Sequence, residues 1–593
     1  MAGIVIQLLG PPSITHPDGE GRQPRGRKSW GLLTHLLLHA TPTARSHLAS
    51  LLFTGADDPL GALRWHLADL RRILGPGAVL GGNPVALRLP PGFRLDTDLG
   101  AGPPAEVPAE LLDGLDFTDH PPFDAWLMME RHRLRHAVET LVYEGGLAAL
   151  ADGDSAAAIR LGARAVELDP LNADFHALLV RSLVAAGDRG AARTAAAHCG
   201  DVFGEQLGSG LPAEVQHALA APDTGGEAGL PATPTAVASY LEAAEACLSA
   251  GATATALTHL RVAGNLAERL GDRTLQAKAL LDLAGALIHG AGGRGAEVAD
   301  LLHRALSLAG DGPPAIRSAA YRELGFLAVQ RGFPDSGARW LARATEAAEG
   351  LPDERARALG VAGMLATDTA DYPGAVVALE ESVRLSVGIG RTRQEAFSRA
   401  MLGRVHLLTG HRDRAALELD TVLALVAGEH WTAFTPFVEA LRSEVHLGIG
   451  DDSAAEDMAD HAMALAASLG DRCFLDAAAH AKAQVLLARG DTGAASTWIR
   501  RGVQPNPWYR WFRGRNLDLA STAALATDPH QALEFARELG ERSSRYGHRE
   551  LAVRALSARA ALGDEAVLPA MTLLARGIEN PLLTQDLAVR HHL

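Results

Sequence analysis

Cysteine is scarce in this sequence, which contains three among 593 residues. Cys199, Cys247 and Cys473 lie far apart and share no ligand spacing, which excludes a disulfide framework and a zinc module. Free cysteine usually behaves as a small apolar residue. We therefore expect all three to be buried or half-buried.

Long apolar runs are also missing. No stretch reaches the roughly 18–20 apolar residues that a membrane-spanning helix needs. The N-terminal sequence MAGIVIQLLGPPSI lacks the basic start and the long apolar run of a signal peptide. These absences predict a cytoplasmic protein with no membrane segment.

Catalytic motifs are a further absence. The sequence has no Gly-x-Ser-x-Gly elbow, no His-Glu-x-x-His and no cysteine–histidine metal cluster. Segment 21–29, GRQPRGRKS, resembles a phosphate-binding loop, but Arg27 separates Gly26 from Lys28 and a proline stands where backbone amides would hold phosphate. We expect no enzymatic activity, no cofactor and no metal.

Charge is unevenly distributed along the chain. Residues 1–100, called the head below, contain ten Lys and Arg against seven Asp and Glu, a net charge of about +3. The whole chain carries −15, which leaves about −18 on the remainder. A mildly basic head on an acidic body suits a protein that contacts nucleic acid at one end only.

The head has the pattern of a winged helix-turn-helix. Apolar runs and breakers predict a strand over 4–14, helices over 27–40, 44–53 and 60–75, a hairpin of 78–80 with 85–89, and a third extended piece over 92–98. In this order of elements the third helix enters the major groove and the hairpin contacts the phosphate backbone.

The third helix carries the candidate DNA contacts. Its leucines at 63, 67, 70 and 74 form one stripe that we expect to face the core, and Asp57 or Asp58 can cap it. Arginine reads guanine edges and phosphates, so its arginines are groove candidates, while Arg88 and Arg94 on the hairpin would hold phosphates. The full set is Arg64, Trp65, Ala68, Arg71, Arg72, Arg88, Arg94, Arg27 and Lys28. The alternative is an ordinary solvated helix face.

A helical repeat follows the head. Gly153 and Gly187 are 34 residues apart, each followed by Asp and a small-residue helix, and LDPLN at 168–172 lies between them. This spacing is typical of a tetratricopeptide unit, which is a helix–turn–helix.

Residues 1–222 resemble the DNA-binding and bacterial transcriptional activator domain pair of SARP-type regulators. The resemblance is carried, in order, by RKSWGLLTHLLLHATPTARSHLASLLF, ALRWHLADLRRILG, AWLMMERHRLR and AVELDPLNADFHALLVRSLVAAGDRGAA. It implies a winged helix that reads direct repeats near a promoter. It also implies an activator domain that dimerises or contacts RNA polymerase.

The remainder reads as a helical array. Segment 223–235 is rich in Gly, Pro and Thr, which predicts a linker. Turn signals then recur at Gly332, Asp371, Gly410, Gly450, Gly490 and Asp528, at intervals of 38 to 40 residues. Repeats of this length bury their apolar faces against neighbours and form a superhelix with a concave groove. Such grooves bind peptides, protein partners or small molecules.

One aromatic segment stands out in the array. NPWYRWFRGRN, at 506–516, is a candidate partner or ligand site through ring stacking and cation–π contact. Its candidate residues are Trp508, Tyr509, Arg510, Trp511 and Arg513. The alternative is that the rings fill the seam between two repeats.

Together these features predict a mainly α protein: a winged-helix head (1–100, α+β), an activator domain (106–222), a linker (223–235) and a tetratricopeptide-like α-solenoid (236–593). The expected function is a DNA-binding transcription activator whose partners are double-stranded DNA, RNA polymerase and a protein or small-molecule effector in the repeat groove. A homodimer is left open. The alternative function is a helical-repeat scaffold whose winged helix no longer binds DNA.

Overall fold

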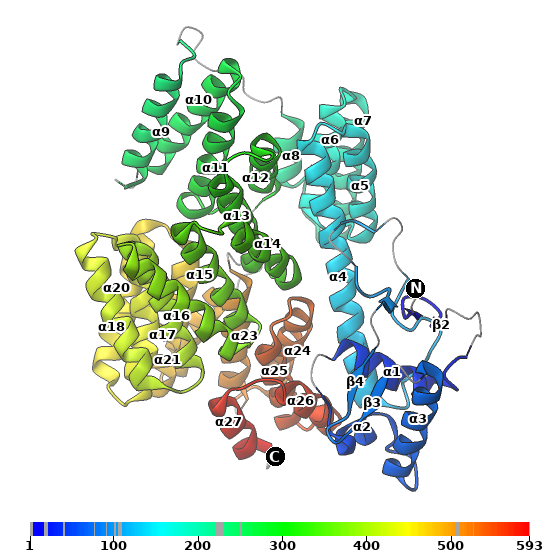
Figure 1. The fold of residues 1–593 in the computed structure, drawn as a ribbon. Helices are drawn as coiled ribbons and strands as arrows, with labels where there is room; N and C mark the ends of the chain where they lie inside the picture. Colours follow the sequence, from blue (N-terminus) through cyan, green and yellow to red (C-terminus); the bar gives the residue numbers. More distant parts are fainter. Residues whose placement is uncertain are drawn as a thin grey trace. The chain divides into compact units, whose positions relative to one another are not determined.

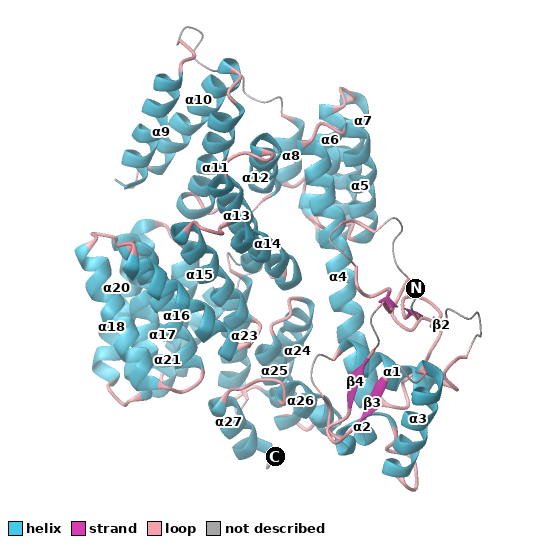
Figure 2. Ribbon diagram, in the orientation of Figure 1, coloured by secondary structure: helices cyan, strands magenta, loops and turns pink. Residues whose placement is uncertain are grey.

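The computed structural model describes residues 4–16, 22–39, 42–75, 78–89, 92–99, 102–104, 109–220, 231–249, 252–293, 295–503, 509–525 and 527–591. The chain divides into two compact units. The head unit joins Met1–Val138 to Gly514–Leu593, and the repeat unit is Glu139–Arg513. Helices dominate, with a few short strands near the N-terminus (Figures 1 and 2). The predicted mainly α class is confirmed.

The head contains the predicted elements in the predicted order. They are β1 (Val5–Gln7), β2 (Ser13–Thr15), α1 (Arg27–Leu38), α2 (Arg45–Leu52), α3 (Pro59–Leu74), β3 (Val79–Gly81), β4 (Ala86–Arg88) and β5 (Arg94–Leu95). β3 and β4 pair antiparallel as the hairpin, and β5 lies parallel to β1.

The first predicted strand is in fact two. β1 and β2 pair antiparallel, with Ile6 opposite Ile14. Gly10 between them has a φ of 90°, a conformation that glycine adopts without strain. The prolines after it have no amide hydrogen to donate to a ladder, so the chain turns back here.

Local chemistry explains where α3 begins and ends. The Asp58 carboxylate accepts a hydrogen bond from the backbone N–H of Gly61 at 2.8 Å, which satisfies one of the free donors of the first turn. Gly75, with a φ of 76°, ends the helix. The leucine stripe between them is at most 2% exposed, so its prediction as the core face is confirmed.

Five helices follow the head. They are α4 (Pro121–Ala151), α5 (Ser155–Leu168), α6 (Ala173–Ala185), α7 (Arg189–Leu207) and α8 (Ala213–Leu219). Gly153 and Gly187 lie at the turns before α5 and α7 with φ values of 81° and 82°. Asp154 and Asp188 then cap these helices, each at 2.9 Å from a backbone N–H. The predicted 34-residue unit therefore has a physical basis in a glycine turn followed by an aspartate cap.

The array continues as helix pairs. Its elements are α9 (Pro234–Ser249), α10 (Thr253–Leu270), α11 (Arg273–Gly290), α12 (Ala296–Ala309), α13 (Pro314–Arg331), α14 (Pro334–Ala347), α15 (Pro352–Asp368), α16 (Tyr372–Gly388), α17 (Thr392–Leu408), α18 (Arg412–Gly428), η1 (Thr432–Phe434), α19 (Thr435–Gly448), α20 (Asp452–Leu469), α21 (Arg472–Ala488), α22 (Thr492–Gly502) and α23 (Arg510–Ala524). The predicted turns from Gly332 to Asp528 all fall between the two helices of a pair. The repeat prediction is confirmed.

The chain ends in helices that belong to the head unit. Besides the part of α23 from Gly514 onward, these are α24 (Pro529–Arg545), α25 (Arg549–Ala561), η2 (Glu565–Val567), α26 (Leu568–Ala575) and α27 (Pro581–His591). Leu573 of α26 is 3% exposed and shares one apolar core with α1, α2, α3 and the first half of α4.

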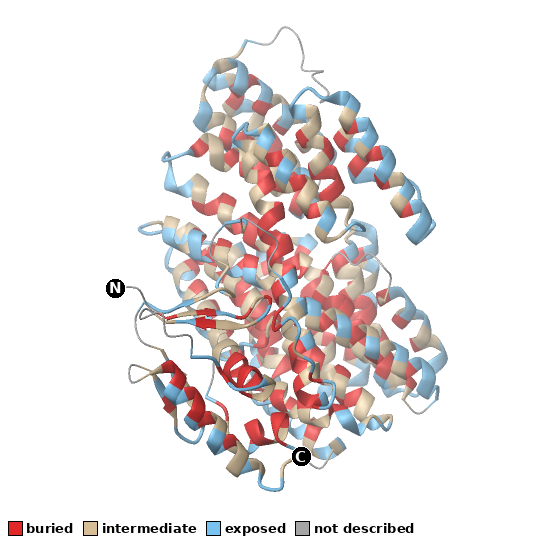
Figure 3. Cartoon of the chain, turned by 90° about the vertical axis from the view of Figure 1, so that its right-hand side faces the viewer, coloured by how far each residue is buried: buried red, intermediate tan, exposed pale blue. Residues whose placement is uncertain are grey.

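Buried residues follow the faces along which helices meet, and exposed residues follow the opposite faces (Figure 3). Cys199 and Cys473 are buried and Cys247 is half-buried, as predicted. Among the described helices, none is both long and apolar enough to cross a membrane.

Candidate functional site

The outer face of α3 presents four of the predicted DNA contacts. Arg64, Trp65, Ala68 and Arg72 are all exposed, and Trp65 keeps 53% of its surface accessible although it is a large aromatic residue. The leucine stripe of the same helix is buried, so burial and exposure divide the helix lengthwise.

The arginines on this face differ in how firmly they are held. Arg64 lies 3.3 Å from Asp58, with both side chains about two-thirds exposed, and such surface pairs contribute little. Arg72 lies 2.6 Å from Asp69, whose side chain is 5% exposed. Arg64 is therefore the less restrained of the two.

Arg71 has a structural contact in addition to its exposure. Its Nε donates to the backbone carbonyl of Leu80 at 2.5 Å. A Cβ on Gly81 would lie 3.1 Å from the Arg71 guanidinium, so the glycine leaves room for this side chain. Arg71 thereby ties α3 to the hairpin strand β3.

The two arginines predicted on the hairpin lie on different sheets. Arg88 is exposed on β4, as expected. Arg94 is also exposed but lies on β5, paired with β1 rather than with the hairpin. Its backbone N–H donates to Ile4 at 2.9 Å, which corrects the predicted location.

The basic pair at the start of α1 is half-buried. Arg27 donates to the backbone carbonyl of Asp116 at 2.7 Å and pairs with Asp119. Lys28 lies 5.7 Å from the ring centre of Phe53. Both side chains therefore have partners within the head unit.

Sequence reasoning missed one arginine of the head. Arg45, at the start of α2, donates from Nε to the carbonyl of Gly82 at 2.9 Å. Its backbone N–H donates to the Asn83 side chain at 3.2 Å. This side chain holds the hairpin turn against α2, and no local pattern marks it because its partners are 37 and 38 residues away.

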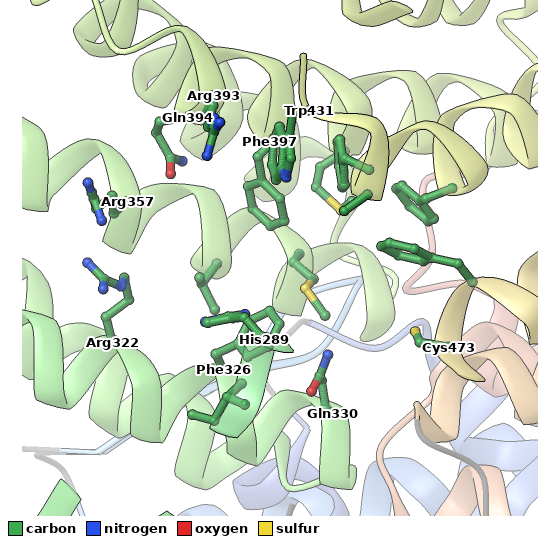
Figure 4. A pocket seen from close by; sticks show the side chains of 18 of the residues that line it. His289, Arg322, Phe326, Gln330, Arg357, Arg393, Gln394, Phe397, Trp431 and Cys473 are labelled. Carbon is green, nitrogen blue, oxygen red and sulfur yellow. The ribbon is translucent and has the colours of Figure 1, made fainter. Parts of the chain in front are cut away.

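A second candidate site is a cavity of about 670 Å³ within the repeat unit. Its walls come from α11, α13, α15, α17, η1, α19, α21 and the start of α23. Figure 4 shows one side lined by Arg322, Arg357, Arg393 and Gln394, and aromatic rings such as Phe397 and Trp431 beside them. None of these residues was singled out from the sequence.

Charged side chains on the polar side form an ion-pair network. Arg322 pairs with Glu354 at 2.6 Å and with Glu323 at 2.8 Å, and His289 lies 2.9 Å from Glu323. Burial raises the pKa of Glu323, but the charges of His289 and Arg322 outweigh it and the pKa is lowered. Glu323 therefore stays ionised.

The aromatic side is a continuous series of ring contacts, two of them stacked and one tilted. Trp431 and Phe434 are stacked with centres 4.6 Å apart, Phe434 lies 5.6 Å from Phe437, and Phe437 lies 5.6 Å from Phe474. Aromatic residues make up 5% of the chain. Their grouping at HWTAFTPF (430–437) is the signal that could have located this wall in the sequence.

The predicted aromatic segment packs inward. Tyr509 and Trp511 are 4% and 5% exposed, and Arg404 lies 3.6 Å from the ring centre of Trp511. Arg404 also pairs with Asp368, which accepts a hydrogen bond from the Tyr509 hydroxyl. Tyr509 and Trp511 thus pack against side chains of α15 and α17, helices that lie more than 100 residues earlier in the chain.

The other residues predicted in segment 506–516 differ in how far they are buried. Arg510 is half-buried and Arg513 is buried, whereas Trp508 lies outside the described residues. Of this set, Tyr509 borders the cavity. The described residues contain no group of three or more His, Cys, Asp or Glu arranged to hold a metal ion.

Comparisons with known proteins find one family and several distant structures. The model of the bacterial transcriptional activator domain matches residues 96–221. No curated protein matches the sequence.

Three solved structures align with more than half of this chain. A Rap protein complexed with competence and sporulation factor is 13% identical, with 60% of this chain and 99% of that chain aligned and a TM-score of 0.45. A signal-transduction ATPase with a tetratricopeptide repeat sensor from Pyrococcus horikoshii is 14% identical over 60% and 54% of the two chains, with a TM-score of 0.37. Yeast Tom70 is 13% identical over 79% and 95%, with a TM-score of 0.31. These likenesses are too distant to carry an argument about function.

The family match coincides with the part of the chain in which the sequence resembles SARP-type regulators. Residues 96–221 match the model of the bacterial transcriptional activator domain, and helical repeats follow this segment, as that resemblance implied.

Proposed function

We propose that this protein is a transcription activator that binds promoter DNA through the head and senses an effector through the helical repeats. One observation carries the first half of the proposal. It is the exposed arginine face of α3, opposite its buried leucine stripe, in a chain whose residues 96–221 match the model of the bacterial transcriptional activator domain.

The contacts divide between bases and phosphates. With α3 in the major groove, Arg64 and Arg72 reach guanine edges or phosphates, and Trp65 and Ala68 lie against the groove wall. Arg88 on the hairpin contacts phosphate. Arg71 would contact DNA as well as hold the hairpin, because its hydrogen bond to the Leu80 carbonyl sets the position of the hairpin relative to α3.

The remaining predicted basic residues lie around this surface. Arg27, Lys28 and Arg94 would contact phosphates beyond the groove, although the first two also have intramolecular partners. The activator domain would dimerise or contact RNA polymerase, so that two heads occupy direct repeats in a promoter.

The head's small excess of positive charge favours a second candidate. With a net charge of about +3, the head is less basic than strong DNA binders, so the protein would be a helical-repeat scaffold whose winged helix serves as a docking surface. The two functions differ in whether the full-length protein binds DNA at all.

A salt titration tests the proposal. Full-length protein is titrated with the promoter region upstream of its own gene at several salt concentrations. We expect specific binding, with log K falling against log salt by about 0.9 for each phosphate contacted. Absence of a protein–DNA complex at low salt would instead support the scaffold function.

Charge-matched variants locate the surface. Arg64→Ala with Arg72→Ala should weaken binding at least about tenfold, because each base contact is worth about 1–3 kcal/mol. Arg133→Ala with Arg135→Ala removes two positive charges from α4 in the same unit, where these side chains are 38% and 54% exposed. This control should change affinity less than about threefold. Equal effects of the two sets of changes would remove α3 as the DNA-binding helix.

A further inference from the structure

The cavity in the repeat unit has the size of a small-molecule site. Its volume of about 670 Å³ lies within the roughly 300–1,000 Å³ that is usual for organic ligands. Its walls combine rings with a few convergent polar groups (Figure 4), which is the general make-up of such sites.

Positive charge exceeds negative charge at one rim of the cavity. Arg357 and Arg391 share the single carboxylate of Asp353, at 3.4 Å and 3.1 Å. Arg393 has Glu429 at 3.7 Å. Three guanidinium groups therefore face two carboxylates, at distances longer than those of strong ion pairs.

These guanidinium groups are accessible to a ligand. The side chains of Arg357, Arg391 and Arg393 are 40%, 55% and 51% exposed. Arg322 and Arg404, which also line the cavity, are 11% and 1% exposed and have close carboxylate partners. An incoming anion would therefore bind at the rim and not at the two buried arginines.

The aromatic wall begins beside this rim. The Arg393 guanidinium lies 5.7 Å from the ring centre of Trp431, and the series of ring contacts continues through Phe434 to Phe437. A planar apolar group inserted here would gain both buried area and ring stacking.

A buried polar atom also borders the cavity. Gln330 is 6% exposed, and its side-chain oxygen is buried with no hydrogen-bond partner among the described residues. Figure 4 places this amide at the edge of the cavity. A buried acceptor without a donor is costly, so a ligand with an O–H or N–H group would satisfy it.

We propose that the cavity binds an aromatic organic anion, with its acidic group at Arg357, Arg391 and Arg393 and its ring system on Trp431 and Phe434. This occupant is the effector in the function proposed above, and the inference rests on that function only for its regulatory consequence. Binding itself is measured without DNA.

Two dyes that differ in one charged group test the proposal. 1-Anilinonaphthalene-8-sulfonate is an aromatic anion, and N-phenyl-1-naphthylamine has the same rings without the sulfonate. Calorimetry and fluorescence on the full-length protein should show one site per chain for the anion. The uncharged dye should bind the same site about tenfold or more weakly.

Cavity variants separate the two halves of the site. Arg357→Gln with Arg393→Gln should reduce affinity for the anionic dye about tenfold and change that for the uncharged dye less than about twofold. Trp431→Ala should weaken both dyes. Arg384→Gln is the control, because this arginine is 68% exposed on α16 and pairs with Glu381 outside the cavity; it should change neither.

Thermal melts of each variant establish that it is folded. Equal loss of both dyes in the arginine variant would overturn the anion site, as would failure of the folded wild type to bind the anionic dye at one site per chain. These readouts are independent of DNA. A protein that fails to bind DNA but binds the anion in this way would refute the proposed function and leave the cavity's assignment intact.

Discussion

Charged side chains in the interior of the repeat unit form ion pairs with residues that are distant in the sequence. Arg404 pairs with Asp368 across 36 residues, and Arg331 pairs with Asp174 across 157 residues. Burial opposes the charge of Arg404, but Tyr509 and Asp368 outweigh it and its pKa is raised. Removal of one partner of such a pair leaves an uncompensated buried charge, which is strongly destabilising.

Asp476 is a half-buried acid whose environment favours the neutral form. Burial raises its pKa from 3.8 to about 7, although Arg472 and Arg501 oppose the shift. Between these two values the folded protein keeps a proton that the unfolded chain loses. The free energy of unfolding therefore falls as pH rises from about 4 to about 7.

Asp476→Asn should remove this pH dependence. Relative to the wild type, the variant should gain stability progressively between about pH 4 and pH 7, as measured by chemical denaturation at each pH. Asp413→Asn, an exposed position on α18, is the control and should follow the wild-type curve. Parallel curves for wild type and Asp476→Asn would contradict the effect of burial on this carboxyl group.

Helix pairs in the array pack through a repeated glycine–leucine contact. A Cβ on Gly325 would lie 2.8 Å from Leu341, and one on Gly403 would lie 2.8 Å from Leu419. The same contact recurs at Gly363, where the distance to Leu379 would be 2.3 Å. In these three pairs, the first helix thus presents a glycine to the leucine 16 residues later on the second.

Gly363→Ala should destabilise the repeat unit by about 1–3 kcal/mol, because the fully buried Leu379 has no space into which to move. Gly285→Ala is the matched control in the interior of α11, where an added Cβ would meet nothing within 4 Å. It should stabilise by up to about 1 kcal/mol through helix propensity. Urea denaturation measures the free energy of unfolding of both variants. If both changes have the same sign, the glycine–leucine contact does not limit helix packing.

At the scale of the whole chain, the head unit is not built from consecutive residues alone. The head unit takes in Gly514–Leu593 as well as Met1–Val138. Leu573 shares the core that also contains Leu48, Leu67 and Trp126. The last helices therefore contribute to the stability of the segment that is proposed to bind DNA.

Leu573→Ala should destabilise the head unit. Loss of a buried leucine costs about 2–5 kcal/mol, so amide hydrogen exchange in α2 should accelerate, since α2 contacts α26. Leu419→Ala is the control, because this leucine is equally buried but lies in the repeat unit. Unchanged exchange in α2 of the Leu573 variant would mean that the head folds without the C-terminal helices.

Much of the architecture follows from short-range patterns. The leucine stripe of α3, a cap at Asp57 or Asp58 and the turn glycines at Gly153 and Gly187 were predicted, because helix periodicity, capping and turns depend on a few neighbouring residues. The structure shows which aspartate is the cap, namely Asp58. The double strand at the N-terminus was missed because its pairing depends on how a turn closes and not on composition.

The candidate sites depend much more on tertiary structure. The sequence by itself determined the order of elements, the exposed arginine face of α3 and the 40-residue repeat, since each reflects local conformational preference. Only the tertiary structure decided that Arg71 bonds Leu80, that Leu573 completes the head core and that Arg393 meets Trp431 at a cavity. These contacts join residues whose neighbours in the sequence carry no information about the partner, because packing brings them together only after the helices have formed.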